Sequence, residues 1–142
     1  MALDYSITLK PLSPDTELKA LKKVLSKRFQ LQFPWRSKLI FDELVSVGIF
    51  KSTIPPWVKS PLNRPPRIGI NIRINKFDWD KAILKMLQIA SYVFQFIAEK
   101  AILKFNGEYL LAKKFHQVIA IVELSEFWRP EFKLMFLKPQ IS

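Results

Sequence analysis

The stretch Arg67-Ile68-Gly69-Ile70-Asn71-Ile72-Arg73-Ile74-Asn75 carries the clearest structural pattern in the chain. Isoleucine occupies every second position from residue 68 to residue 74, and polar or small residues alternate with it. Because successive side chains of a β-strand point to opposite faces, this alternation predicts a strand with one face in a hydrophobic core. Its other face carries arginine and asparagine.

Before this strand, the sequence predicts another strand and two helices. Residues 5–9 alternate between apolar and polar side chains, which predicts a half-buried strand near the N-terminus. Residues 13–17, Ser-Pro-Asp-Thr-Glu, combine an N-cap candidate with a proline and early acids, so a helix should start there and reach about residue 29. A second, shorter helix is predicted from about Trp35 to Val47, with Gly48 as its C-terminal stop.

After the strand at 67–75, the sequence predicts a long helix and two more strands. Asp78 or a neighbour can cap a helix that continues to about Phe105, where Asn106-Gly107 would end it. Apolar side chains recur along this segment at alternating spacings of four and three residues, as on one face of a helix. Residues 118–122 and 131–136 both predict strands, the first of them more buried.

Together these elements predict a single α+β domain over residues 1–142. A long central helix would pack on a mainly antiparallel, or mixed, sheet, and two shorter N-terminal helices would complete the domain. Residues 54–66 hold five prolines and predict a stiff extended loop. Residues 1–76 form a basic front half, and residues 77–142 form an apolar back half that supplies most of the core.

Composition excludes several classes of protein. The chain contains no cysteine, so it has no disulfides, thiolate metal sites or cysteine nucleophile. Its start shows no basic, then apolar, secretory signal. The longest uncharged apolar-rich run, residues 86–98, is well short of the roughly 20 residues that span a bilayer. We therefore expect a cytoplasmic protein without a membrane span.

The positive charge is concentrated in the front half. The chain has 23 Lys and Arg against 12 Asp and Glu, which gives a net charge of +11. Counting up to Lys76 gives 14 basic and 5 acidic residues, or +9, whereas the remainder has 9 basic and 7 acidic residues, or +2. Clustered cations repel one another unless an anion binds, so this asymmetry indicates an anionic macromolecular partner.

Candidate contacts for that partner are the front-half cations and two tryptophans that lie among them. Lysine and arginine would contact phosphates, and the tryptophans could stack on unpaired bases. The full candidate set is Lys19, Lys22, Lys23, Lys27, Arg28, Trp35, Arg36, Trp57, Lys59, Arg64, Arg67 and Arg73.

No strong catalytic, metal or cofactor motif is present. His116 is the only histidine, and the three glycines are too far apart for a phosphate-binding loop. We therefore expect no catalytic residue, no metal and no cofactor. Asp15 with Glu131-Phe132-Lys133 can be matched to the carboxylate and Glu-x-Lys pattern of one class of metal-dependent nuclease. The side chains to test for that chemistry would be Asp78, Asp80, Glu123, Glu131 and Lys133.

Three functions follow from these observations. The leading hypothesis is a non-enzymatic binding protein whose cationic surface docks on an anionic macromolecule, most plausibly nucleic acid. The alternative is an inhibitor or immunity-type protein that neutralises an acidic protein partner. A metal-dependent nuclease is the third. The sequence leaves homo-oligomerisation open.

Overall fold

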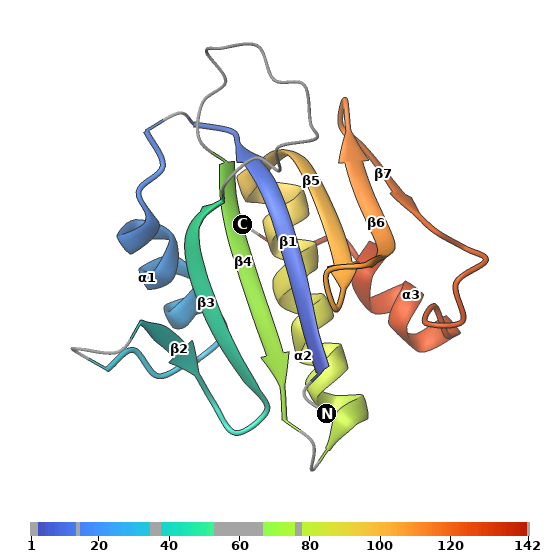
Figure 1. Cartoon of the computed structure of the whole chain (residues 1–142), viewed down its shortest axis with the longest axis horizontal. Helices are drawn as coiled ribbons and strands as arrows, with labels where there is room; N and C mark the ends of the chain where they lie inside the picture. The colour runs from blue at the N-terminus through green and yellow to red at the C-terminus, as the bar shows by residue number, and fades with distance from the viewer. Residues whose placement is uncertain (1–2, 14, 35–37, 53–66, 76–77, 142) are drawn as a thin grey trace.

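The computed structural model describes residues 3–13, 15–34, 38–52, 67–75 and 78–141. In this part of the chain seven strands form one antiparallel sheet in the order β2-β3-β4-β1-β5-β6-β7 (Figure 1). The strands are β1 (Leu3–Pro11), β2 (Leu39–Phe41), β3 (Val45–Ser52), β4 (Arg67–Ile74), β5 (Ala98–Phe105), β6 (Tyr109–Phe115) and β7 (Val118–Ile121).

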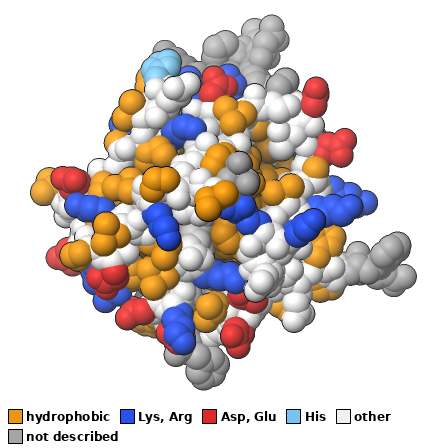
Figure 2. Space-filling view, turned by 180° about the vertical axis from the view of Figure 1, so that it is seen from behind, with side chains coloured by type: hydrophobic (Ala, Val, Ile, Leu, Met, Phe, Trp, Pro, Cys, Tyr) orange, Lys and Arg blue, Asp and Glu red, His pale blue; other side chains and the backbone are white. Residues whose placement is uncertain are grey.

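The helices cover one face of this sheet. They are α1 (Leu18–Arg28), α2 (Trp79–Tyr92) with the π-helical turn η1 (Val93–Ile97), and α3 (Pro130–Leu137). In Figure 1, α2 runs behind the central strands, with α1 and α3 to either side. Ring contacts between Phe29 and Tyr92, and between Phe94 and Phe136, join the three helical segments on this face. Figure 2 views this helix-covered side. The opposite face, toward the viewer in Figure 1, carries no helix from the described residues, and we call it the uncovered face.

The core lies between the sheet and the helices. Tyr5, Ile7 and Leu9 on β1 are buried and point toward the helices, and the intervening residues point to the uncovered face. Ile7 pairs with Ile70 of β4 on one side and with Leu103 of β5 on the other. Strand β1 therefore joins β2, β3 and β4 to β5, β6 and β7 in one sheet.

Several predicted elements are confirmed. The alternating segments at 5–9 and 67–75 are β1 and β4, the leucine-rich segment after residue 17 is α1, and β7 lies within 118–122. The predicted start of the first helix at 13–17 is wrong, because α1 begins at Leu18 with Glu17 as its N-cap and has no acid in its first turn. The Asp78 carboxylate caps α2 by accepting a hydrogen bond from the Lys81 N–H at 3.4 Å. Strand β7, however, lies at the sheet edge with Val118 exposed, so the prediction of a more buried strand is wrong.

The predicted fold class is wrong in its arrangement, because the protein is mostly sheet and has one short N-terminal helix. The part of the segment 35–47 that the structure describes is not helical: it forms β2 and the start of β3. Val45, Val47 and Ile49 are buried and alternate with half-buried or exposed residues, which is a strand pattern. Gly48 lies within β3, where a Cβ would be 3.1 Å from the Leu39 side chain of β2, and does not end a helix.

The long helix is also shorter than predicted. Helical geometry ends at Ile97, and the last eight residues of the predicted helix form β5 between β1 and β6. Asn106 and Gly107, predicted as a helix end, have φ values of 50° and 72° and form the turn between β5 and β6. Asn-Gly favours positive φ both at the end of a helix and in a hairpin turn, so this pair of residues does not distinguish the two structures.

The predicted strand near the C-terminus is a helix. Residues 131–136, predicted as a strand, lie in α3, which has Pro130 at its first position. Proline suits that position because its nitrogen has no hydrogen to donate. Phe132 and Phe136, one helical turn apart, are both buried. Strand β6 was not predicted.

Candidate functional site

The predicted contact residues that the structure describes lie on two different faces of the molecule. Lys19, Lys23 and Lys27 are exposed at every fourth position of α1, on the side away from the sheet, and Lys22 is half-buried. Lys and Arg side chains gather at the right of Figure 2, where α1 lies in that view. Arg28 has a structural contact: its guanidinium lies 4.3 Å from the centre of the Tyr92 ring and donates a hydrogen bond to the Ile141 carbonyl.

Arg67 and Arg73 lie on β4 and share the uncovered face of the sheet. Arg73 Nε donates to Asp4 Oδ1 of β1 at 3.0 Å, so this arginine already has an acidic partner. The remaining predicted contacts lie outside the described residues: Trp35, Arg36, Trp57, Lys59 and Arg64. The structure therefore brings Arg67 and Arg73 onto one face and separates them from the α1 lysines.

A cationic hollow of about 580 Å³ lies on the uncovered face. We call it the sheet-face hollow, and none of the described residues that line it is acidic. Strands β1, β5 and β6, which supply most of its lining, lie side by side in Figure 1. The described lining residues are Thr8, Leu9, Lys10, Arg67, Lys100, Ala101, Ile102, Lys113, Lys114 and Phe115.

Sheet register explains why the cations of the hollow are close together. Lys10 of β1 is paired directly with Lys100 of β5, and Ile102, two residues along β5, is paired with Lys113 of β6. Like charges directly opposite each other on neighbouring strands are destabilising. Glu99 lies 3.5 Å from the Lys10 ammonium and offsets part of this repulsion, while Lys100 and Lys113 are exposed. The hollow therefore concentrates positive charge at a cost in stability.

Phe115 forms an aromatic wall of the hollow. It is 53% exposed, and the Lys100 ammonium lies 4.9 Å from the centre of its ring. The next two residues, His116 and Gln117, have φ values of 50° and 67° and form the two-residue turn to β7. Two positive φ values are characteristic of a type I′ hairpin turn. His116 thus lies in a turn at the hollow's edge, and it lines a smaller hollow of about 280 Å³ together with Glu99 and Lys100.

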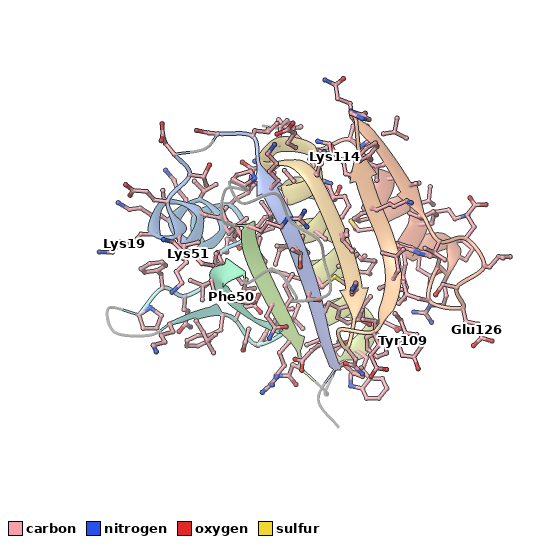
Figure 3. All side chains as sticks on the ribbon, turned by 45° about the horizontal axis from the view of Figure 1, so that its top comes forward. Lys19, Phe50, Lys51, Tyr109, Lys114 and Glu126 are labelled. Atoms are coloured by element: carbon pink, nitrogen blue, oxygen red, sulfur yellow. The ribbon has the colours of Figure 1, made fainter. Side chains whose placement is uncertain are left out.

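Lys114, the residue between Lys113 and Phe115, points the opposite way. Its ammonium donates hydrogen bonds to the carbonyls of Phe94 at 2.7 Å and Ala98 at 2.8 Å, where η1 passes into β5. Burial lowers the pKa of Lys114 below its usual value. Figure 3 shows Lys114 and Tyr109 at opposite ends of β6. By fixing β6 from beneath, Lys114 directs its two neighbours toward the hollow.

Replacing Lys114 by methionine should therefore destabilise the fold. Methionine retains the unbranched apolar stem but leaves the Phe94 and Ala98 carbonyls without their donor, which should reduce the free energy of unfolding by about 1–3 kcal/mol. Urea unfolding curves of the two proteins would measure the difference. Lys113→Met is the matched control, because Lys113 is exposed, and should change stability by less than about 0.5 kcal/mol. Equal effects of both substitutions would contradict this anchoring role.

Two more hollows adjoin these cationic surfaces. One of about 690 Å³ shares Lys10 and Arg67 with the sheet-face hollow, but its lining also includes Asp15, Glu17 and Glu99. The other, of about 840 Å³, lies along α1 and is lined by Lys19, Lys23 and Lys27 together with Glu17, Ala20, Ser26 and Phe33. Phe33, which follows α1 in the chain, is 41% exposed there, so this hollow combines the cations of α1 with an apolar side chain.

Asp78, Asp80, Glu123 and Glu131, the four carboxylates proposed for testing, have cationic partners. Asp80 and Glu131 both contact Arg129, at 2.8 and 3.3 Å. Glu123 lies 3.5 Å from Lys133, and Asp78 lies 3.7 Å from Lys81. Within the described ranges, no group of three His, Asp or Glu side chains is placed to hold a metal ion.

Comparisons with protein-family models, curated proteins and solved structures find no match to this chain. None of the helices in the described residues is long and apolar enough to cross a membrane.

Sequence reasoning missed most of the sheet-face hollow. Arg67 was included, but Lys10, Lys100, Lys113 and Phe115 were not. Residue 100 lies within the predicted long helix, and residues 113 and 115 lie in no predicted helix or strand. The available signal was Asn106-Gly107 as a hairpin turn, followed by the apolar residues 109–112 and the strand at 118–122.

Proposed function

We propose that this protein is a non-enzymatic nucleic-acid-binding protein and that it binds through the sheet-face hollow. The observation that carries the proposal is the arrangement of Lys10, Arg67, Lys100 and Lys113 around one concavity with no acid among its described lining residues. Phosphate groups would neutralise these cations and relieve the repulsion between the paired Lys10 and Lys100. Exposed Phe115 adds a surface on which a base can stack.

The proposal includes a cytoplasmic location, because a cysteine-free chain suits a reducing compartment where nucleic acid is present. Binding needs no cofactor or metal in this scheme. The contacts are ammonium and guanidinium groups with phosphate, which is sequence-independent recognition.

A second candidate function is supported by the surface of α1. The hollow beside Lys19, Lys23 and Lys27 contains Phe33, an exposed aromatic ring bordered by cations. Protein interfaces combine such apolar anchors with charged rims that select an oppositely charged partner. This arrangement supports an inhibitor or immunity-type protein that covers an acidic protein, with the α1 side as its interface.

Two double charge reversals test the proposed function. The hollow variant combines Lys100→Glu with Lys113→Glu and removes positive charge from the sheet-face hollow. The α1 variant combines Lys19→Glu with Lys23→Glu and changes the net charge by the same amount on α1. Fluorescence anisotropy would follow labelled single-stranded RNA and duplex DNA at several salt concentrations. Nuclease-treated protein is needed so that its surface starts free of nucleic acid.

Wild-type binding should weaken steeply with salt. The hollow variant should bind more weakly, and the slope of log affinity against log salt should become shallower by about 0.7–0.9 for each phosphate that the variant no longer neutralises. The α1 variant should keep the wild-type slope. No binding at low salt would refute the proposal, and weaker binding by the α1 variant alone would favour an α1 interface. Oligonucleotide cleavage in the presence of Mg²⁺ would instead identify a nuclease.

A further inference from the structure

We infer that the sheet-face hollow binds a single strand and that one base of this strand stacks on Phe115. This inference rests on the proposed function and adds the class of nucleic acid and the residue that selects it. It depends on what surrounds the Phe115 ring, on the energies of two competing contacts, and on the size of the hollow.

Phe115 differs from the other exposed aromatic side chains on or near the sheet. Phe50, 48% exposed, lies over Gly69 of the neighbouring strand, where an added Cβ would meet its ring at 2.5 Å. Tyr109, 61% exposed, stacks on Phe105 with ring centres 6.2 Å apart. Both rings thus pack on their own sheet.

Phe115 has no ring contact with an aromatic side chain of another strand among the described residues. Its ring contacts among the described residues are with the adjacent His116, at 4.0 Å between centres, and with the Lys100 ammonium. The ring therefore borders a charged hollow beside Val118, its cross-strand partner on β7, and 53% of Phe115 stays exposed. Exposed aromatic surface at the edge of a cationic site is the combination used to bind unpaired bases.

The energies favour exchange of lysine for a base on this ring. An exposed cation–π contact contributes about 0.5–1 kcal/mol. Stacking of a base on an aromatic side chain contributes about 1–3 kcal/mol. A base that replaces Lys100 on Phe115 also frees the ammonium to contact the phosphate of the same strand, so the two interactions support each other.

A duplex cannot use this ring in the same way. Both faces of an interior base pair are already stacked on their neighbours, and only a strand with unpaired bases can turn one toward a protein side chain. The volume of about 580 Å³ lies within the range of about 300–1,000 Å³ typical of small-molecule sites. The hollow thus accommodates a nucleotide-sized part of a strand.

Phe115→Leu tests the stacking contact, because leucine keeps an apolar side chain but has no aromatic face. Affinity for a short single-stranded oligonucleotide should fall about 5- to 160-fold, corresponding to removal of one base stack. Affinity for a duplex of equal length should stay within about twofold of wild type, since duplex binding depends on phosphate contacts. Phe115→Tyr should retain single-strand binding. Tyr109→Leu is the matched control at the other end of β6 and should change neither affinity.

A second measurement leaves the protein unchanged. Wild-type protein would be titrated with an oligonucleotide in which abasic sites replace the bases, so the phosphates remain and the stacking surfaces are removed. Its affinity should fall by a similar factor to that caused by Phe115→Leu, and the variant should not discriminate between the two ligands. Circular dichroism and thermal melting of each variant would show whether it remains folded.

The outcomes separate this inference from the proposed function. Equal weakening of single-strand and duplex binding by Phe115→Leu, or unchanged single-strand affinity, would overturn the stacking inference while nucleic-acid binding itself stands. Tighter binding to duplex than to single strands would also overturn it. Absence of binding to any of these ligands at low salt would refute the proposed function and the inference with it.

Discussion

Replacing Phe136 by alanine should lower the free energy of unfolding by about 3–5 kcal/mol. Phe136 lies on α3, is fully buried, and packs with ring centres 5.1 Å from Phe94 and 5.3 Å from Trp128. Alanine removes the whole ring and leaves a cavity between α3 and η1 that rigid neighbours can fill only in part. Urea unfolding monitored by circular dichroism would measure the change.

Leu134→Ala is the matched control for this helix. Leu134 is 74% exposed on α3, so its truncation should change stability by less than about 0.5 kcal/mol. A similar destabilisation in both variants would show that α3 contributes by helix propensity and not by burial of Phe136. A decrease below about 1 kcal/mol for Phe136→Ala would contradict its role in the core.

The packing of Phe136 also bears on the sheet-face hollow. Trp128, its ring neighbour, donates a hydrogen bond from Nε1 to the Leu111 carbonyl of β6 at 2.9 Å. Strand β6 carries Lys113 and Phe115 on its opposite face. The aromatic cluster beneath β6 therefore supports the strand that supplies part of the proposed binding surface.

Replacing Asp42 by alanine should reduce stability by about 3 kcal/mol. Asp42 lies in the turn between β2 and β3, where its Oδ1 accepts the N–H groups of Leu44 and Val45 at 2.7 and 2.8 Å. Its Oδ2 lies 2.7 Å from the Lys85 ammonium of α2, and both side chains are less than one-fifth exposed. Alanine leaves a largely buried lysine without its counter-charge, which is more destabilising than removal of a surface ion pair. Urea unfolding at neutral pH would measure the difference.

The same carboxylate predicts a dependence of stability on pH. Burial raises the pKa of Asp42, but the hydrogen bond from Lys85, the Val45 and Leu44 N–H groups, and the charge of Lys85 together lower the pKa below the usual 3.8. Because the folded-state pKa is lower than the unfolded value, the contribution to stability is complete above pH 3.8. It is lost as the pH falls toward the folded-state pKa.

Asp42→Asn separates the charge from the turn hydrogen bonds. Asparagine keeps an oxygen acceptor for the two backbone N–H groups but cannot form the ion pair with Lys85. The difference in unfolding free energy between wild type and Asp42→Asn should be constant near neutral pH and shrink in acid. A difference that does not change down to pH values below 3.8 would contradict the assigned pKa direction.

The elements that were predicted well have a pattern compatible with one structure only. Four isoleucines at every second position make β4 apolar on one face, whereas the same spacing on a helix would distribute them around its surface. In α1 the buried Leu21 and Leu25 are four residues apart and lysines occupy the other faces. Local periodicity was sufficient in both cases.

The secondary-structure prediction is wrong for three segments, because the local pattern of each fits both a helix and a strand. The apolar positions of 98–105 continue the helical spacing of α2, yet Ala101 and Leu103 also alternate as in a strand. Within α3, Phe132, Leu134 and Phe136 alternate, while Phe132 and Phe136 are also one helical turn apart. The segment 39–52 also fits both structures: part of it was predicted as a helix, and it contains β2 and β3. Strand partners that are distant in the sequence distinguish two of these segments, because β5 pairs with β1 and β3 pairs with β4. Residues 131–136 instead form a helix with local hydrogen bonds, and its buried face packs on the core.

The candidate site was predictable only in part for a related reason. The polar face of β4 placed Arg67 correctly on an exposed surface. The closeness of Lys10 to Lys100, ninety residues away, depends on the antiparallel register of β1 with β5. Periodicity within either segment contains no information about that register.

By itself, the sequence determined the strongly alternating strands β1 and β4, the amphipathic α1, the capped start of α2 at Asp78, and the excess of positive charge. Only the tertiary structure decided that residues 98–105 become β5, and that cations from β1, β4, β5 and β6 line one hollow. The physical reason is that side-chain periodicity is local, whereas a strand is stabilised by backbone hydrogen bonds to neighbours that are distant in the sequence. The register of those hydrogen bonds determines which charges meet.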